Sequence, residues 1–165
     1  MNFELYLDKF NLAAAALDRS LLKKKQLEVS VGIILNSVFL KLYKTAWSND
    51  PHNALTAETR IFFSVWINDK AIEDKKVLYN IHALKLRKLK GYSIASREFA
   101  KSFRAAFKPF ENNWENVSVN FGPLTLMEGW VNYQENDLEK IVLKLAKKFL
   151  AIENLIDKTL IQFKQ

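Results

Sequence analysis

The segment LEVSVGIILNSVFLKLY, residues 27–43, restricts the fold more than any other part of the chain. Apolar side chains alternate strictly over residues 27–35, and a second alternation runs over residues 38–42. Strict alternation places every second side chain on one face of a β-strand. The register changes at Asn36-Ser37, so the segment predicts a hairpin of two strands, although Asn-Ser is a weaker turn sequence than Asn-Gly.

Three further segments have the composition of strands. RIFFSVWI, residues 60–67, is β-branched and aromatic on both faces, as expected of a strand that is covered on two sides. Residues 116–121 and 124–133 are predicted as an aromatic-rich hairpin that turns at Gly122-Pro123. Together with the first hairpin, these segments predict a sheet.

The segment 77–90 fits two structures. Its apolar residues alternate from Val77 to Ala83 as in a strand, whereas the preceding acids, the late basic run and Gly91 at its end are typical of a helix. The strand is favoured, with the first residues pairing with residues 60–67 and the sequence KLRKLK turning away. A helix remains the alternative.

Three segments have helical periodicity. Residues 3–24 repeat apolar side chains at intervals of four and three, and three lysines, residues 23–25, lie at the C-terminal end of this segment. Residues 96–107 place three phenylalanines on one face, with Ser96 as the expected cap and Pro109 as the stop. Residues 137–163 form a long amphipathic pattern, with Asn136 as the expected cap.

This order of elements predicts an α+β fold in a single domain, residues 1–165. We expect an antiparallel or mixed sheet of about five to six strands, with an N-terminal helix, a middle helix and a long C-terminal helix. The length suits one core, and four glycines and three prolines leave little room for a flexible linker.

The composition of the chain limits the kinds of site that it can form. The chain has no cysteine and two isolated histidines, and it contains no Gly-rich phosphate-binding loop, so we expect no metal and no cofactor. The N-terminal residues do not resemble a secretory signal. The longest runs without charge are 12 residues, well below the ~20 needed to cross a bilayer. We therefore expect a cytoplasmic protein with no membrane insertion.

The net charge of +7 is concentrated in one segment. Of the 25 basic and 18 acidic residues, eight basic and one acidic lie in residues 82–108, so the remainder of the chain has 17 of each sign. Four of the eight recur along one side of the predicted helix 96–107, opposite its phenylalanines. The eight are Lys85, Arg87, Lys88, Lys90, Arg97, Lys101, Arg104 and Lys108.

The first functional hypothesis is a non-catalytic binding module that meets an anionic partner through these eight side chains. Nucleic acid is the commonest partner of such a surface. The ordinary alternative is that the side chains are solvated or pair with acids distant in sequence.

Two other functions stay open. The terminal helices or the aromatic segment Trp114 to Trp130 could form a contact with a second copy of the chain or with another protein. An enzyme could use Glu128 or His82 in a pocket, and this is the least favoured of the three. Glu128 would have a raised pKa if its face of the strand pointed inward, and would be solvated if the face with Met127 did. His82 is expected to be hydrogen-bonded within the fold rather than catalytic.

Overall fold

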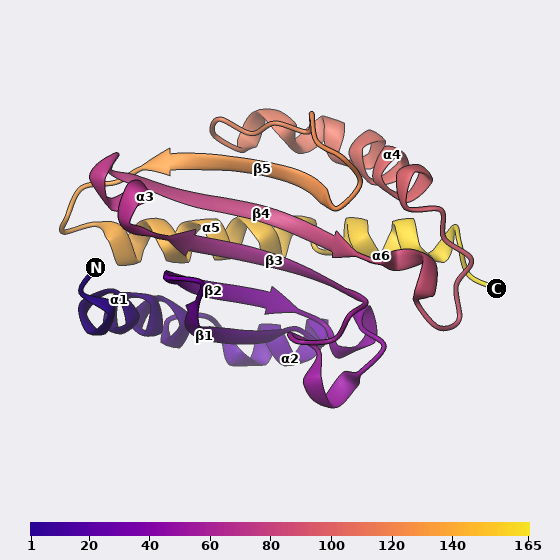
Figure 1. Cartoon of the computed structure of the whole chain (residues 1–165), viewed down its shortest axis with the longest axis horizontal. Coiled ribbons are helices and arrows are strands. Elements are labelled where there is room, and N and C mark those ends of the chain that lie inside the picture. Colours follow the sequence, from indigo (N-terminus) through magenta and orange to yellow (C-terminus); the bar gives the residue numbers. More distant parts are fainter.

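A five-stranded antiparallel sheet forms the centre of the molecule in a computed structural model, which describes all of residues 1–165 (Figure 1). The strands lie in chain order, and each pairs antiparallel with the next. They are β1 (Glu28–Ile34), β2 (Ser37–Tyr43), β3 (Arg60–Ile67), β4 (Lys76–Leu84) and β5 (Thr125–Asn132).

Helices cover one face of this sheet. Figure 1 shows α5 and α6 running behind the strands, with α1 and α2 on the β1 side. The middle helix α4 packs against α6 and the edge strand β5. The helices are α1 (Phe3–Ala15), α2 (Arg19–Lys25), α3 (Asp69–Glu73), α4 (Ser96–Phe107), α5 (Leu138–Ile152) and α6 (Asn154–Ile161). The predicted α+β fold, with a helix at each end and one in the middle, is confirmed.

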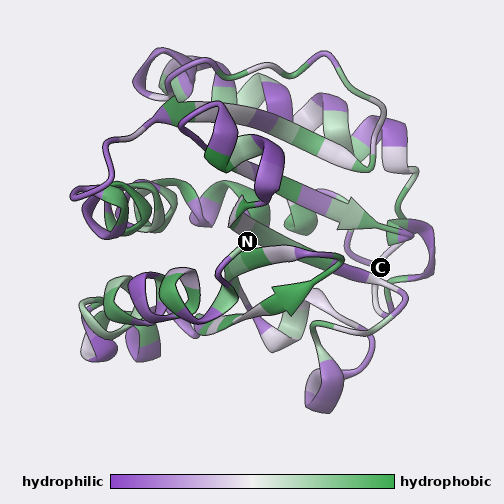
Figure 2. Ribbon diagram, turned by 60° about the vertical axis from the view of Figure 1, so that its left-hand side comes forward, coloured by the Kyte–Doolittle hydropathy of each residue, from purple (hydrophilic) through white to green (hydrophobic).

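The core lies between the sheet and these helices. Phe63 of β3 stacks on Phe149 of α5 with ring centroids 4.5 Å apart, and both rings are fully buried. Figure 2 shows hydrophobic residues along most of the strands and hydrophilic residues on the loops. Tyr79 crosses over Gly129 of the neighbouring strand, where a Cβ would collide with the tyrosine hydroxyl. This close approach lets the hydroxyl donate a hydrogen bond of 2.6 Å to the carbonyl of Glu115.

The first predicted hairpin is confirmed, with its turn one residue earlier than expected. Ile34 pairs with Ser37, and the two residues between them, Leu35 and Asn36, both have positive φ, at 46° and 61°. Two consecutive residues in this conformation form the type I′ turn that matches the twist of paired strands. The turn leaves the Leu35 side chain 92% exposed.

The ambiguous segment 77–90 is a strand in its first half. β4 pairs with both β3 and β5, and it ends where Lys85 takes a φ of 50°. A 3-10 turn, Leu86–Lys88, then follows. Both the favoured strand and the turning away of KLRKLK are confirmed.

Both long predicted helices are interrupted. Asp18 separates α1 from α2 because its carboxylate accepts a hydrogen bond from the backbone N–H of Leu21 and so begins a new helix. At the other end of the chain, the predicted long helix is confirmed over residues 138–161, with the single turn residue Glu153 between α5 and α6. Two predicted caps are also wrong, since Ala95 precedes α4 and Asp137 precedes α5.

Residues 116–121 do not form the predicted strand. Only Ser118 pairs with β5, through two backbone hydrogen bonds with Glu128. Asn116 before it has a φ of 55°, and the Ser118 hydroxyl accepts a hydrogen bond from the N–H of Asn120, which turns the chain away. Local hydrogen bonds of this kind compete with strand pairing.

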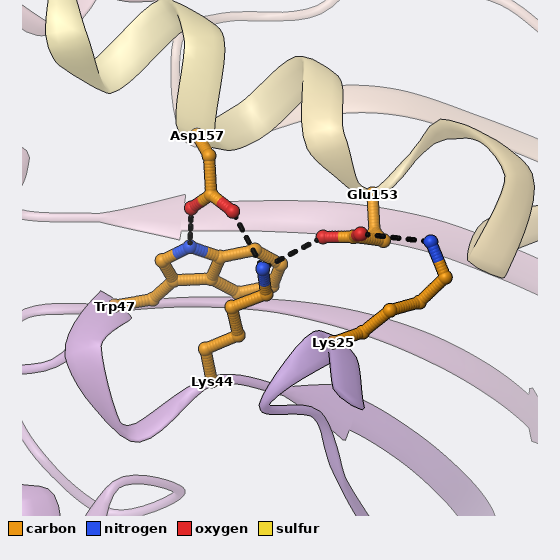
Figure 3. Close-up of polar contacts among 5 residues, drawn as sticks. All are labelled: Lys25, Lys44, Trp47, Glu153 and Asp157. Carbon is orange, nitrogen blue, oxygen red and sulfur yellow. Dashed lines mark hydrogen bonds and ion pairs between the residues drawn. The ribbon is translucent and has the colours of Figure 1, made fainter. Parts of the chain in front are cut away.

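A partly buried group of charges links α6 to the end of β2 (Figure 3). The Lys44 ammonium lies 2.8 Å from Glu153 and 2.5 Å from Asp157, and Lys25 also reaches Glu153, at 3.3 Å. Trp47 donates its indole N–H to Asp157 at 2.8 Å. Burial lowers the pKa of Lys44, but the hydrogen bonds to the two carboxylates outweigh burial and leave that pKa raised.

Candidate anion-binding site on the open face of the sheet

The second face of the sheet, toward the viewer in Figure 1, carries no long helix. Strand register places four polar residues side by side across it, one from each of β2, β3, β4 and β5. They are Lys41, Ser64, Asn80 and Glu128. We call them the polar row.

Aromatic residues lie on both sides of the polar row. Phe39 and Trp66 are paired across β2 and β3 on one side, and Phe62 and His82 are paired across β3 and β4 on the other. The ring of Phe39 also covers Gly32 of β1, where a Cβ would lie 2.9 Å from it. The aromatic rings therefore shield the polar row from water although no helix covers it.

A pocket of about 350 Å³ opens over the polar row. The β1–β2 turn contributes one wall, and the ends of β3 and β4 contribute the opposite wall. The lining residues are Ile34, Leu35, Ser37, Phe39, Lys41, Arg60, Phe62, Ser64, Trp66, Asn80, His82, Leu84 and Glu128. Its volume lies in the range of small-molecule sites.

Lys41 is the most unusual group in the pocket. Its side chain is 7% exposed, and no carboxylate forms an ion pair with it. The ammonium instead lies 4.5 Å from the ring centroids of both Phe39 and Phe62. Burial, assisted by the positive charge of Arg60, lowers the pKa of Lys41 to about 8.

Arg60 adds a second cation without a counter-ion. Its guanidinium donates to the backbone carbonyl of Ala57 and lies 5.4 Å from the Phe62 ring centroid. Its buried Nε has no hydrogen-bond partner. Burial lowers the pKa of Arg60 as well. Two positive groups thus line the same pocket, and neither forms an ion pair with a carboxylate.

Asn80 and Glu128 form the other end of the polar row. The Asn80 amide N–H donates to the Glu128 carboxylate at 3.2 Å, while the buried Asn80 Oδ1 has no donor. Met127 faces the helices, so Glu128 lies on the open face, but the pocket keeps it half-buried rather than fully solvated. The orientation is therefore the second of the two considered from the sequence, with the face of Met127 inward.

His82 lines the same pocket, so the structure brings both candidate titratable residues together. Its ring lies against Phe62 at 5.4 Å, and its side chain makes none of the hydrogen bonds expected from the sequence. Burial lowers the pKa of His82; Glu128 opposes this effect, and Lys41 and Arg60 add to it. The balance of these effects favours the neutral imidazole.

The eight basic residues predicted from the sequence lie outside this pocket. Lys85 and Lys88 share Glu58, and Lys108 pairs with Glu111. Arg104 donates to four backbone carbonyls between residues 121 and 126, so it fastens the chain before β5 to α4. The remaining four are exposed and in no ion pair: Arg87, Lys90, Arg97 and Lys101.

Sequence reasoning missed Lys41, Arg60 and Asn80. A signal was present in β2 and β3, because Phe39, Lys41 and Ser64 all fall on the strand face opposite the aliphatic residues. Aromatic residues on both faces of β3 predicted cover on two sides. Both faces are indeed buried, but neighbouring side chains rather than a second layer of helices bury the open one.

Comparison with family models, with curated proteins and with solved structures finds no match to this chain. The site is therefore interpreted from its own geometry. No three histidine or carboxylate side chains gather where they could hold a metal ion. No helix combines the length and the apolar character needed to cross a bilayer.

Proposed function

We propose that this chain is a non-catalytic binding module that holds a small organic anion in the pocket on the open face of the sheet. One observation carries the proposal: the buried Lys41 ammonium faces the pocket, and no carboxylate of the chain neutralises it. Buried charges in proteins are normally paired, because burial without a partner is costly. A bound anion would supply the missing charge.

The surroundings of Lys41 favour a particular kind of anion. Arg60 offers a second positive group in the same pocket. Phe39 and Trp66 provide a flat apolar wall beside the polar row. We infer that the ligand carries a carboxylate or phosphate on a flat or apolar body.

Calorimetric titration with benzoate and phenyl phosphate tests this proposal, with benzamide as an uncharged probe of the same shape as benzoate. We expect the two anions to bind and benzamide not to bind. Lys41→Met should weaken anion binding about tenfold or more, since hydrogen bonds to charged groups contribute about 1.5–3 kcal/mol. Lys147→Met, on the exposed surface of α5, serves as the matched control and should bind as the wild type does. Equal affinity for benzoate and benzamide would rule the proposal out.

A second candidate is nucleic-acid binding through the four basic residues that have no acidic partner. Arg87, Lys90, Arg97 and Lys101 lie on the β4–α4 connection and on α4, at one end of the molecule (Figure 1). Unpaired exposed cations of this kind favour phosphate contacts. Binding to single-stranded or duplex DNA and RNA should then fall steeply with salt, and Arg97→Glu combined with Lys101→Glu should reduce it. Undetectable binding at low salt would exclude this candidate.

A further inference from the structure

We propose that the Lys41 amine is a nucleophile that forms a reversible imine with an aldehyde or keto group of the bound ligand, so that the natural ligands are small oxo acids. This inference rests on the proposed function, because it concerns the same pocket and takes the ligand to be an anion. It adds a covalent step to what would otherwise be simple binding.

The position of Lys41 meets the requirements of a nucleophilic lysine. An amine attacks a carbonyl only as the free base, and proteins favour that form by burying the side chain among apolar groups and by placing another cation nearby. Phe39 and Phe62 enclose the Lys41 amine, and Arg60 supplies the second positive charge. No carboxylate holds the proton on it.

Comparison with Lys44 shows that the lack of a carboxylate partner distinguishes Lys41 from another buried lysine. The two lysines are equally buried, at 8% and 7% exposed, and three residues apart in the chain. Lys44, however, lies within 2.8 Å of two carboxylates, which keep its ammonium charged. Burial alone therefore does not make a lysine nucleophilic in this chain. We infer that a lysine becomes nucleophilic here when it is buried, has no carboxylate partner and lies beside another cation.

The pocket also holds groups that suit the rest of the reaction. The Lys41 nitrogen would bond to the carbonyl carbon, and the carbonyl oxygen would take a proton to give a carbinolamine. Loss of the hydroxyl as water and of the last nitrogen proton gives the imine, with no change of oxidation state. The half-buried Glu128 and the His82 imidazole line the same pocket and are the candidates to accept and return these protons. Arg60 would hold the carboxylate of an oxo acid.

Reductive trapping detects imine formation at each lysine directly. The full chain is incubated at pH 7.5 with glyoxylate and cyanoborohydride, or with uncharged propionaldehyde and cyanoborohydride, and the modification of each lysine is followed by peptide mass spectrometry. Reduction turns an imine into a stable secondary amine at the lysine that formed it. We expect Lys41 to be modified about tenfold faster than the exposed Lys147 or more, since far more of the Lys41 amine is unprotonated at that pH.

Two variants sharpen the test. Arg60→Met should slow trapping of glyoxylate at Lys41 much more than trapping of propionaldehyde, because only glyoxylate carries a carboxylate. Lys147→Arg should leave trapping at Lys41 unchanged with either probe. Modification of Lys41 no faster than Lys147 with both aldehydes would overturn the inference.

The experiments distinguish failure of the anion-binding proposal from failure of the imine proposal. If benzoate binds but neither aldehyde is trapped selectively at Lys41, the imine is wrong and anion binding stands. If propionaldehyde is trapped selectively at Lys41 while benzoate and phenyl phosphate do not bind, the nucleophile stands, and both the anionic ligand and the oxo-acid class are wrong.

Discussion

Lys41 and Lys44 lie three residues apart and are both more than nine-tenths buried, yet only Lys44 meets carboxylates. Glu153 and Asp157 raise the pKa of Lys44 against the effect of burial, whereas burial and Arg60 lower the pKa of Lys41 to about 8. The same residue type therefore holds the fold together at one position and weakens it at the other. A side chain that weakens the fold and faces a pocket is a candidate for function.

Replacing Lys41 by methionine should stabilise the protein. Methionine fills a similar space between Phe39 and Phe62 without a charge that lacks a partner. We expect the free energy of unfolding at pH 7 to rise by at most about 3.5 kcal/mol, which is the pKa shift from 10.5 to about 8 at ~1.4 kcal/mol per unit. Urea unfolding measures the change, and a loss of stability would show that Lys41 has a favourable partner within the chain.

The gain in unfolding free energy from Lys41→Met should depend on pH. The folded-state pKa of Lys41, about 8, is below its ordinary value of 10.5. Between these values the unfolded chain keeps a proton that the folded chain has released, so this group makes stability rise with pH. The stability difference between Lys41→Met and the wild type should be largest below about pH 8 and should decrease as the pH approaches 10. A constant difference between the two proteins from pH 7 to 10 would contradict the low pKa.

Replacing Lys44 by methionine should have the opposite effect. It leaves Asp157 without its ion pair and leaves Glu153, 4% exposed, with only Lys25. Removing one partner from a buried ion pair costs about 3 kcal/mol or more, and Glu153 is the buried carboxylate here. Urea unfolding at pH 7 should therefore show a large loss, and stability within 0.5 kcal/mol of the wild type would indicate that the group is solvated.

Gly129→Ala should destabilise the core at the crossing of Tyr79. The added Cβ would meet the tyrosine hydroxyl, which is held by its hydrogen bond to the carbonyl of Glu115. Overpacking of this kind costs about 1 to 3 kcal/mol. Gly122→Ala is the matched control, because no atom lies within 4 Å of the position of its Cβ. Equal unfolding midpoints for the two variants would show that the crossing is not tight.

Local patterns in the sequence predicted the sheet well. Alternation over residues 27–43 and the composition of residues 60–67 are properties of single strands, and the structure confirms both. The breaks at Asp18 and Glu153 were missed because the apolar periodicity continues across them, as the buried Leu22 and Ile156 show. Periodicity reports the buried side of a helix and is insensitive to one turn that leaves that side unchanged.

The polar row could not be predicted in the same way. Its four members come from four strands, and only the strand register brings them together. The sequence also cannot tell which lysine will meet a carboxylate, since Lys44 finds Glu153 and Asp157 more than a hundred residues away. For the same reason the sequence counted Arg104 among free cations, although it is bound to backbone carbonyls.

The pH dependence of benzoate binding shows directly whether Lys41 is the buried cation that meets the ligand. Calorimetric titration at pH 7.0 and at pH 9.5 compares a protonated with a largely deprotonated Lys41, while the benzoate charge stays constant. We predict that binding weakens about tenfold or more at pH 9.5 in the wild type and in Lys147→Met, and that Lys41→Met binds weakly at both pH values. Equal affinity at the two pH values, or tight binding to Lys41→Met, would mean that Lys41 is not that cation.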